Sequence, residues 1–178
     1  MKNKKGLIVL GSVLLLVGCS NEKTKSESGD ELSFTNKYEC SRVENYTKYD
    51  IEHRNGGGIL TTEEMEEKKN SPVAVEGRIS KVYDFNKEGS KLLAYYEIET
   101  YTYLVDVSMD EEKELYEKKC DNSKKYGYKS CDVKINDKVI TLTRTLDLES
   151  EDNKDVVQKT TMDSVKSDFA EDEIFTCN

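Results

Sequence analysis

The chain has 178 residues, with 27 Lys plus Arg against 36 Asp plus Glu and a formal net charge of −9 at pH 7. This length allows one domain with a modest core. The acidic balance argues against nucleic acid as a partner, because phosphate binding depends on Lys and Arg, and against attachment to anionic lipid through the side chains.

The N-terminus has the layout of an export signal, in which a head with three lysines precedes an apolar run from Gly6 to Gly18. The run is shorter than the about 20 residues of a spanning helix. Its end, Leu16-Val17-Gly18-Cys19, resembles the lipobox of bacterial lipoproteins, in which the cysteine carries a diacylglyceryl group and the signal is cut just before it. The resemblance implies that residues 1–18 are a signal peptide and that Cys19 is the lipidation site. An ordinary secretory signal is the alternative.

Cleavage before Cys19 would leave 160 of the 178 residues. Because the signal contains three of the 27 basic residues and no acid, the remaining net charge is 24 − 36 = −12. Acyl chains such as palmitate then supply the membrane attachment, on the extracytoplasmic face of the cell membrane. Residues 19–33 are polar, charged and without an aromatic residue, which predicts a disordered tether. The folded domain is expected at residues 34–178.

The first part of this domain predicts strands and a short helix. Tyr38–Ile51 is rich in Tyr, Val and Thr and predicts one or two strands, and the three glycines at 56–58 end the pattern. Thr61 lies three residues before Glu64, which is the capping-box spacing of a helix start. Met65 is the only strong apolar residue that follows, so this helix has little to pack.

The next segments predict a hairpin and a helix. Val73–Phe85 and Leu92–Val107 have apolar alternation and flank the turn sequence Asn-Lys-Glu-Gly, which predicts a hairpin. Met109–Lys119 predicts a helix, because a capping box at Ser108 and acids in the first turn suit its start, and lysines suit its end.

The last third predicts a second hairpin and a final helix. Cys131–Ile135 and Val139–Leu148 flank a tight turn, residues 149–155 are loop-like, and a helix begins near Thr161. Ile174–Cys177 is expected as a short strand docked on the sheet. The fold class is therefore α+β, an antiparallel sheet built from hairpins with two helices packed on it.

Four cysteines remain once Cys19 is lipidated, an even number in an exported chain, which predicts two disulfides. Three pairings are possible. We favour Cys120 with Cys131, because a loop of that size joins a helix end to a strand start, and this leaves Cys40 with Cys177. The chain has no C-x-x-C motif of a thioredoxin-like redox site and too few closely spaced ligands for zinc.

The sequence singles out no catalytic residue, cofactor or metal ligand. His53 is the only histidine and has no nucleophile motif beside it, so a solvated position is favoured. The many acids offer pairs for glycoside hydrolysis, but none has an apolar setting. The acidic stretch 147–155 carries oxygen ligands for Ca²⁺ but lacks the glycine and distal glutamate of an EF-hand, so a solubilising loop is favoured.

Tyrosine is the unusual aromatic feature, with 11 Tyr and no Trp. Tyr95, Tyr101 and Tyr103 lie on one face of an ideal strand, where they could stack against sugars or peptide side chains. Packing in a half-buried sheet is the favoured interpretation, because Tyr has high strand propensity. If the domain binds a ligand, this face is the first place to expect it.

The lipobox, the polar tether, an early Y-x-C strand, two hairpins, and a terminal helix followed by a strand ending in cysteine resemble the small surface lipoproteins of unknown function from low-GC Gram-positive bacteria. The chain is distantly similar to the YehR-type lipoproteins among them. The resemblance implies an α+β domain without an established activity. We therefore expect a lipid-anchored, non-enzymatic module at the cell envelope that binds a protein or a cell-wall component. An envelope hydrolase with paired carboxylates, or a structural or inhibitory module acting through the tyrosine face, is the alternative.

Overall fold

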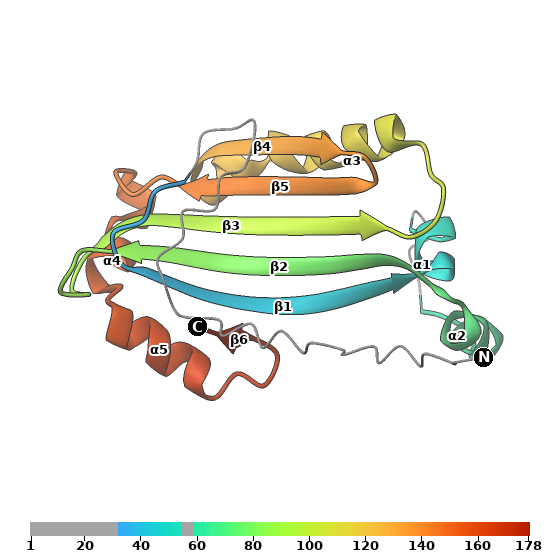
Figure 1. The fold of residues 1–178 in the computed structure, drawn as a ribbon, viewed down its shortest axis with the longest axis horizontal. Helices are drawn as coiled ribbons and strands as arrows, with labels where there is room; N and C mark the ends of the chain where they lie inside the picture. The colour runs from blue at the N-terminus through green and yellow to red at the C-terminus, as the bar shows by residue number, and fades with distance from the viewer. Residues whose placement is uncertain (1–31, 55–58) are drawn as a thin grey trace, which may run out of the picture. The chain divides into compact units, whose positions relative to one another are not determined.

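A six-stranded antiparallel sheet forms the centre of the fold, with the strand order β4-β5-β3-β2-β1-β6 (Figure 1). The computed structural model describes residues 32–54 and 59–178. In chain order, the strands are β1 (Lys37–Thr47), β2 (Val73–Phe85), β3 (Leu92–Tyr103), β4 (Tyr128–Asn136), β5 (Val139–Leu146) and β6 (Thr176–Cys177).

The chain divides into two units, Met1–Ser33 and Phe34–Asn178, and the sheet belongs to the second. The expected signal peptide (1–18), the lipidation site Cys19 and nearly all of the expected tether (19–33) lie outside the described residues and stay predictions. No helix in the described part of the chain is both long enough and apolar enough to cross a membrane.

Both predicted hairpins are present. β2 pairs with β3 through a turn in which Gly89 has a φ of 71°, and the amides of Ser90 and Lys91 donate to the side-chain oxygen of Asn86. β4 pairs with β5 through a turn in which Asp137 has a φ of 53°, a conformation that Asp tolerates better than most residues. β3 is shorter than predicted, because the chain leaves the sheet after Tyr103 and approaches the start of a helix.

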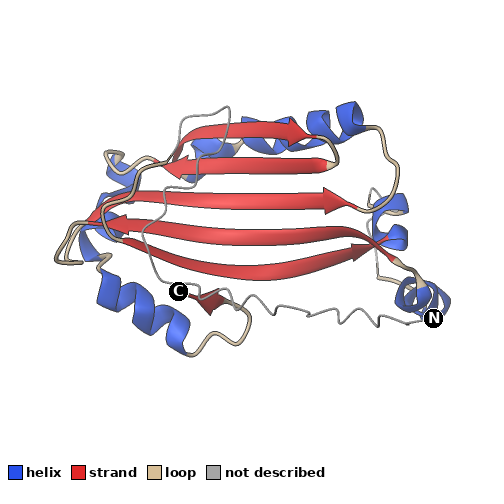
Figure 2. Cartoon of the chain, viewed as in Figure 1, coloured by secondary structure: helices blue, strands red, loops and turns tan. Residues whose placement is uncertain are grey.

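Five helices occur among the described residues, where three were predicted and two of these were expected to pack on the sheet (Figure 2). Threonine capping boxes begin three of them, and the predicted box at Thr61 is one of these. The helix that follows Thr61 buries no residue, in keeping with its lack of apolar side chains. The helices are α1 (Lys48–Glu52), α2 (Thr62–Asn70), α3 (Met109–Asp121), α4 (Glu151–Lys159) and α5 (Met162–Ala170), and a 3-10 turn (η1) covers Ser123–Tyr126.

Two predictions about local structure are wrong. Residues 48–51 are helical rather than extended, because Thr47 and Asp50 form a capping box that starts α1. Residues 151–155 belong to α4 rather than to a loop. Acids in the first turn of α4 suit the positive end of a helix dipole, and the Asn153 amide donates to the carbonyls of Gly127 and Asp147.

Two clusters of apolar side chains lie on the face of the sheet that the helices cover. The first lies under α3 and contains Val75, Tyr101, Tyr103, Tyr116, Ile140 and Leu142. The second lies under α5 and contains Phe85, Leu92 and Val165, with Tyr83, Tyr95 and Phe169 packed against them. Because side chains alternate along a strand, the odd-numbered tyrosines of β3 all point to this helix-covered face.

The structure contains the two disulfides in the favoured pairing. Cys40 of β1 lies opposite Cys177 of β6 in register and is bonded to it across 137 residues of sequence. Cys120, near the end of α3, is bonded to Cys131 of β4 across 11 residues. The first bond therefore holds the C-terminus on the sheet, and the second holds the end of α3 on the β4 edge.

Candidate functional site

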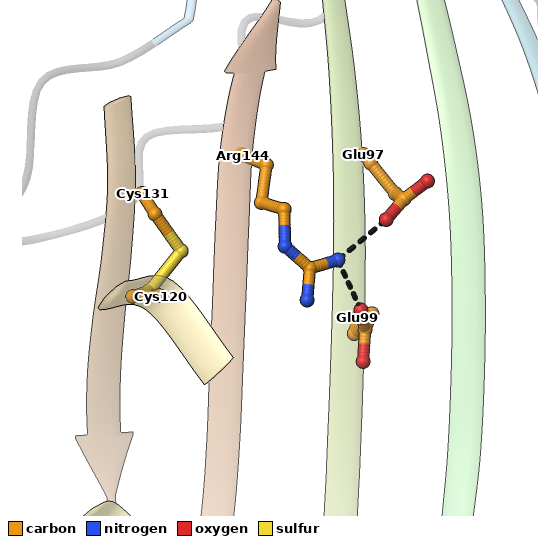
Figure 3. Close-up of a disulfide and its surroundings, with 5 residues drawn as sticks. All are labelled: Glu97, Glu99, Cys120, Cys131 and Arg144. Atoms are coloured by element: carbon orange, nitrogen blue, oxygen red, sulfur yellow. Dashed lines mark hydrogen bonds and ion pairs between the residues drawn. A yellow bond between two sulfur atoms is a disulfide. The ribbon is translucent and has the colours of Figure 1, made fainter. Parts of the chain in front are cut away.

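Charged side chains cross the middle of the helix-covered face, between the two apolar clusters. Glu97 and Glu99 are two residues apart on β3, so both point to this face. Arg144 lies opposite Glu97 on β5, and its Nη1 donates to Oε1 of both glutamates at 2.5 Å (Figure 3). Burial lowers the pKa of Arg144, but the two carboxylates outweigh it and raise this pKa overall. One guanidinium thus pairs with two largely buried carboxylates, which leaves one negative charge uncompensated among the three groups.

Tyrosine hydroxyls extend this charged band toward the first cluster. The Tyr101 hydroxyl donates to Glu99 at 2.6 Å, and the Tyr46 hydroxyl donates to Glu44 of β1 at 2.5 Å. Burial and the adjacent carboxylate raise the pKa of Tyr46 to about 12 and that of Tyr101 further. Gly77 of β2 makes room for this arrangement, because a Cβ there would lie 3.1 Å from the Tyr101 ring and 2.9 Å from the Glu44 carbonyl oxygen.

An aromatic pocket of about 260 Å³ lies between α1, α3 and the sheet. Tyr101 and Tyr116 have ring centroids 5.0 Å apart, and the Lys119 ammonium lies 4.3 Å from the Tyr116 centroid. At the far side of the pocket, Arg54 donates to both oxygens of Glu112 at 2.7 Å, and Tyr103 donates to Glu112 at 2.6 Å. The pocket is lined by Tyr46, Asp50, Ile51, Arg54, Val75, Tyr101, Tyr103, Leu115, Tyr116 and Lys119.

A charged pocket of about 510 Å³ adjoins it. Lys119 lines both pockets, and burial lowers the pKa of its ammonium group. The Tyr128 hydroxyl is 3.3 Å from Glu97, which lies on the sheet side. The lining residues are Glu97, Lys119, Asn122, Ser123, Tyr126, Tyr128 and Arg144. We call the two adjoining pockets the α3 groove.

The disulfide between Cys120 and Cys131 positions the charged pocket. Cys131, which is bonded to Cys120, lies opposite Arg144 in register (Figure 3). Lys119 directly precedes Cys120 in the chain. The bond therefore sets the spacing between the two cations, because Lys119 is on the helix and Arg144 is on the sheet.

The three predicted ligand-binding tyrosines share a face but not a pocket. Tyr101 and Tyr103 are each 4% exposed and line the aromatic pocket. Tyr95 lines a separate pocket of about 250 Å³ beneath α4 and α5. Their role in ligand binding stays a prediction.

Sequence reasoning missed the charged members of the α3 groove, although two patterns indicate them. Glu97 and Glu99 lie in the same strand phase as Tyr95, Tyr101 and Tyr103, which face the core. Arg144 interrupts the alternating apolar residues of β5, in the phase of Ile140 and Leu142, which are fully buried. A charge on the apolar face of a strand needs a partner, so these positions are informative. No local pattern connects Lys119 to them.

The other sequence candidates have structural roles. The His53 ring stacks on Tyr49 with centroids 4.0 Å apart, and its Nδ1 lies 3.0 Å from the Tyr49 carbonyl oxygen. The acidic stretch 147–155 continues into α4. Within residues 32–54 and 59–178, no group of three or more His, Cys, Asp or Glu side chains is arranged to hold a metal ion.

Comparison with known proteins gives no relative: no family model matches the chain, and neither a curated protein nor a solved structure matches it. The resemblance to YehR-type lipoproteins therefore stays an expectation, and the function has to be argued from the site.

Proposed function

We propose that the chain is a lipid-anchored, extracytoplasmic binding protein of the cell envelope, and that its ligand occupies the α3 groove. The observation that carries this proposal is the junction of the two pockets at Lys119, with tyrosine rings on one side and paired charges on the other. Concave sites that combine aromatic walls with a few fixed polar groups are typical of ligand binding. The partner is a cell-wall component or a protein, and binding needs no cofactor.

The envelope placement has two supports. The lipobox at residues 16–19 predicts export and acylation of Cys19. The two disulfides fit an oxidising compartment, because such bonds are rare in the reducing cytosol. The acidic surface argues against nucleic acid as the ligand.

Acylation is tested by growth with an alkyne-labelled palmitate analogue. We expect label on the wild-type protein and none on the Cys19→Ser variant, and we expect protease added to intact cells to digest the wild-type domain. An unlabelled protein that resists protease until the cells are broken would refute the placement.

Ligand binding is tested by sedimenting isolated cell walls with the full-length protein in lipid nanodiscs. Tyr116→Leu, in the α3 groove, is expected to lower cell-wall affinity at least tenfold. Tyr83→Leu is the matched control, because it removes a tyrosine from the second cluster. Both variants are checked for folding by circular dichroism. Equal binding by all three proteins, or by none, would refute the proposed site.

One observation favours an envelope hydrolase as a second candidate. The Oε1 atoms of Glu97 and Glu99 both lie 2.5 Å from one nitrogen, so these two oxygens are at most twice 2.5 Å apart. Retaining glycosidases likewise use two neighbouring carboxyl groups, about 5–5.5 Å apart. Arg144 is paired with both carboxylates, so a substrate would have to break the Arg144–Glu97 or the Arg144–Glu99 ion pair. Hydrolysis of fluorogenic glycosides that is lost in Glu97→Gln would favour this candidate, and no turnover by the wild type would eliminate it.

A further inference from the structure

Lys119 differs from its neighbours on α3 in having no acidic partner. Lys113 and Lys118 each pair with a glutamate four residues away, whereas no carboxylate of the described residues lies within 4.0 Å of the Lys119 ammonium. Lys119 instead lies over the rings of Tyr116 and Tyr101, at 4.3 and 5.5 Å from their centroids. A partly buried ammonium at a pocket wall is a binding point for an anion, because a desolvated charge gains from a counter-charge.

Ser123 supplies a second, independent observation in the same pocket. Its side chain is 3% exposed, and its Oγ has no hydrogen-bond partner among the described residues. Buried hydroxyls are almost always hydrogen-bonded, since leaving one unpaired is unfavourable. Ser123 lines the charged pocket together with Lys119, so a ligand atom in this pocket would satisfy it.

The other groups of the charged pocket indicate which chemical groups the rest of the ligand carries. Both glutamates use the same terminal nitrogen of Arg144, and the other terminal nitrogen has no hydrogen bond to a described residue (Figure 3). That nitrogen is a donor for a neutral oxygen, because the arginine charge is already balanced. Glu97 keeps lone pairs that accept from hydroxyls. Tyr126 and Tyr128 add aromatic surface at the pocket wall.

These groups together describe a ligand with one carboxylate, several hydroxyls and a body that packs on an aromatic ring. We propose that the charged pocket binds an acidic sugar residue, with its carboxylate at Lys119 and Ser123 and its hydroxyls at Arg144 and Glu97. This inference rests on the proposed function and names the ligand class of the α3 groove. A small zwitterionic amino acid fits less well, because it offers no hydroxyls to Arg144 and Glu97 and no ring to Tyr126 and Tyr128. Its ammonium would find the one glutamate charge that Arg144 leaves unpaired, so glycine is the competing probe in the test.

The test uses two probes that differ at one carbon, D-glucuronate and D-glucose, titrated into the ¹⁵N-labelled full-length protein in micelles. We expect glucuronate to shift the amide signals of Lys119, Ser123 and Tyr128, with an affinity at least tenfold higher than that of glucose and lower at high salt. Glycine is titrated in parallel. Equal binding of the two sugars, or shifts with glycine alone, would overturn the inference.

Two variants assign the binding to named groups. Lys119→Met keeps an apolar stem over the tyrosine rings and is expected to lower glucuronate affinity at least tenfold, and Ser123→Ala is expected to lower it severalfold. Lys118→Met is the matched control, because Lys118 is also in the last turn of α3 but pairs with Glu114. Unchanged affinity in Lys119→Met would refute the inference.

The result separates this inference from the proposed function. If cell walls bind in a way that depends on Tyr116 while glucuronate does not bind, the binding function stands and the acidic-sugar assignment fails. If Tyr116→Leu has no effect on cell-wall binding, the proposed function itself fails.

Discussion

The two ends of the helix-covered face differ in how they bury tyrosine. Under α3, the hydroxyls of Tyr46, Tyr101 and Tyr103 each donate to a carboxylate. Under α5, Tyr83 and Tyr95 pack against Phe85 and Leu92, and no hydrogen bond joins their hydroxyls to a described residue. The first end is therefore a polar network with a groove, and the second is mainly apolar packing.

This difference indicates where specificity and where stability should reside. A buried polar network fixes the orientation of its side chains but adds little to the free energy of unfolding. The cost of desolvating each group offsets much of its interaction energy. Apolar packing stabilises without selecting a ligand. Changes under α3 should therefore alter ligand binding, and changes elsewhere should alter only the free energy of unfolding.

Removal of the disulfide between Cys40 and Cys177 should have the largest effect on stability. The chain-entropy account assigns about 5 kcal/mol to a cross-link over a loop this long, so we expect the Cys40→Ala/Cys177→Ala variant to be marginally folded. Urea unfolding at 10 °C measures the loss. Because this bond lies away from α3, the folded fraction should keep its ligand affinity. A tenfold loss of affinity would contradict the separation of ligand binding under α3 from stability elsewhere.

The disulfide between Cys120 and Cys131 should have a smaller effect on stability and a larger one on binding. Its shorter loop corresponds to about 3 kcal/mol. In Cys120→Ala/Cys131→Ala the end of α3 is no longer held beside β4, so we expect weaker binding in the α3 groove as well. Comparison of the two double variants, by urea unfolding and by cell-wall sedimentation, gives the sharpest contrast between the two ends.

Glu112 tests the polar network directly. It is 2% exposed and accepts from Arg54 and Tyr103, so Glu112→Gln should lower the free energy of unfolding by about 2 kcal/mol, the range of hydrogen bonds to charged groups. Glu114→Gln is the control, since Glu114 pairs with Lys118 at the surface, where such pairs contribute about 0–1 kcal/mol. Equal losses of unfolding free energy in the two variants would show that the buried network contributes no more to stability than a surface ion pair.

Alkaline pH should lower stability at both ends of the helix-covered face, because each end holds a tyrosine with a raised pKa. Burial, with a further contribution from Glu44, raises the pKa of Tyr46 to about 12, and burial raises that of Tyr83 to about 12. A raised tyrosine pKa stabilises the folded state below the unfolded value of about 10, and this contribution is lost as pH rises through 12. We expect Tm to be level up to pH 10 and to fall between pH 10 and 12, less steeply in Tyr46→Phe. A level Tm throughout would contradict both shifts.

Local sequence rules predicted the elements that depend on neighbours in the chain. The pairing of β2 with β3 follows from alternation around a turn, and the start of α2 follows from the spacing of Thr61 and Glu64. The same rules failed at residues 151–155, because acidic residues suit both a solvated loop and the first turn of a helix. Packing of α4 near Gly127 and Asp147 decides between the two.

By itself the sequence determined the α+β class and both hairpins, because turns and caps act over short distances. It favoured the observed cysteine pairing among three possibilities, and the structure decided between them. Only the tertiary structure decided the α3 groove. β3 pairs with β5 across the intervening α3 and β4, which brings Glu97 to Arg144, and the Cys120 bond brings Lys119 beside them. Contacts between residues so far apart depend on strand order and register, and neither is written in a local pattern.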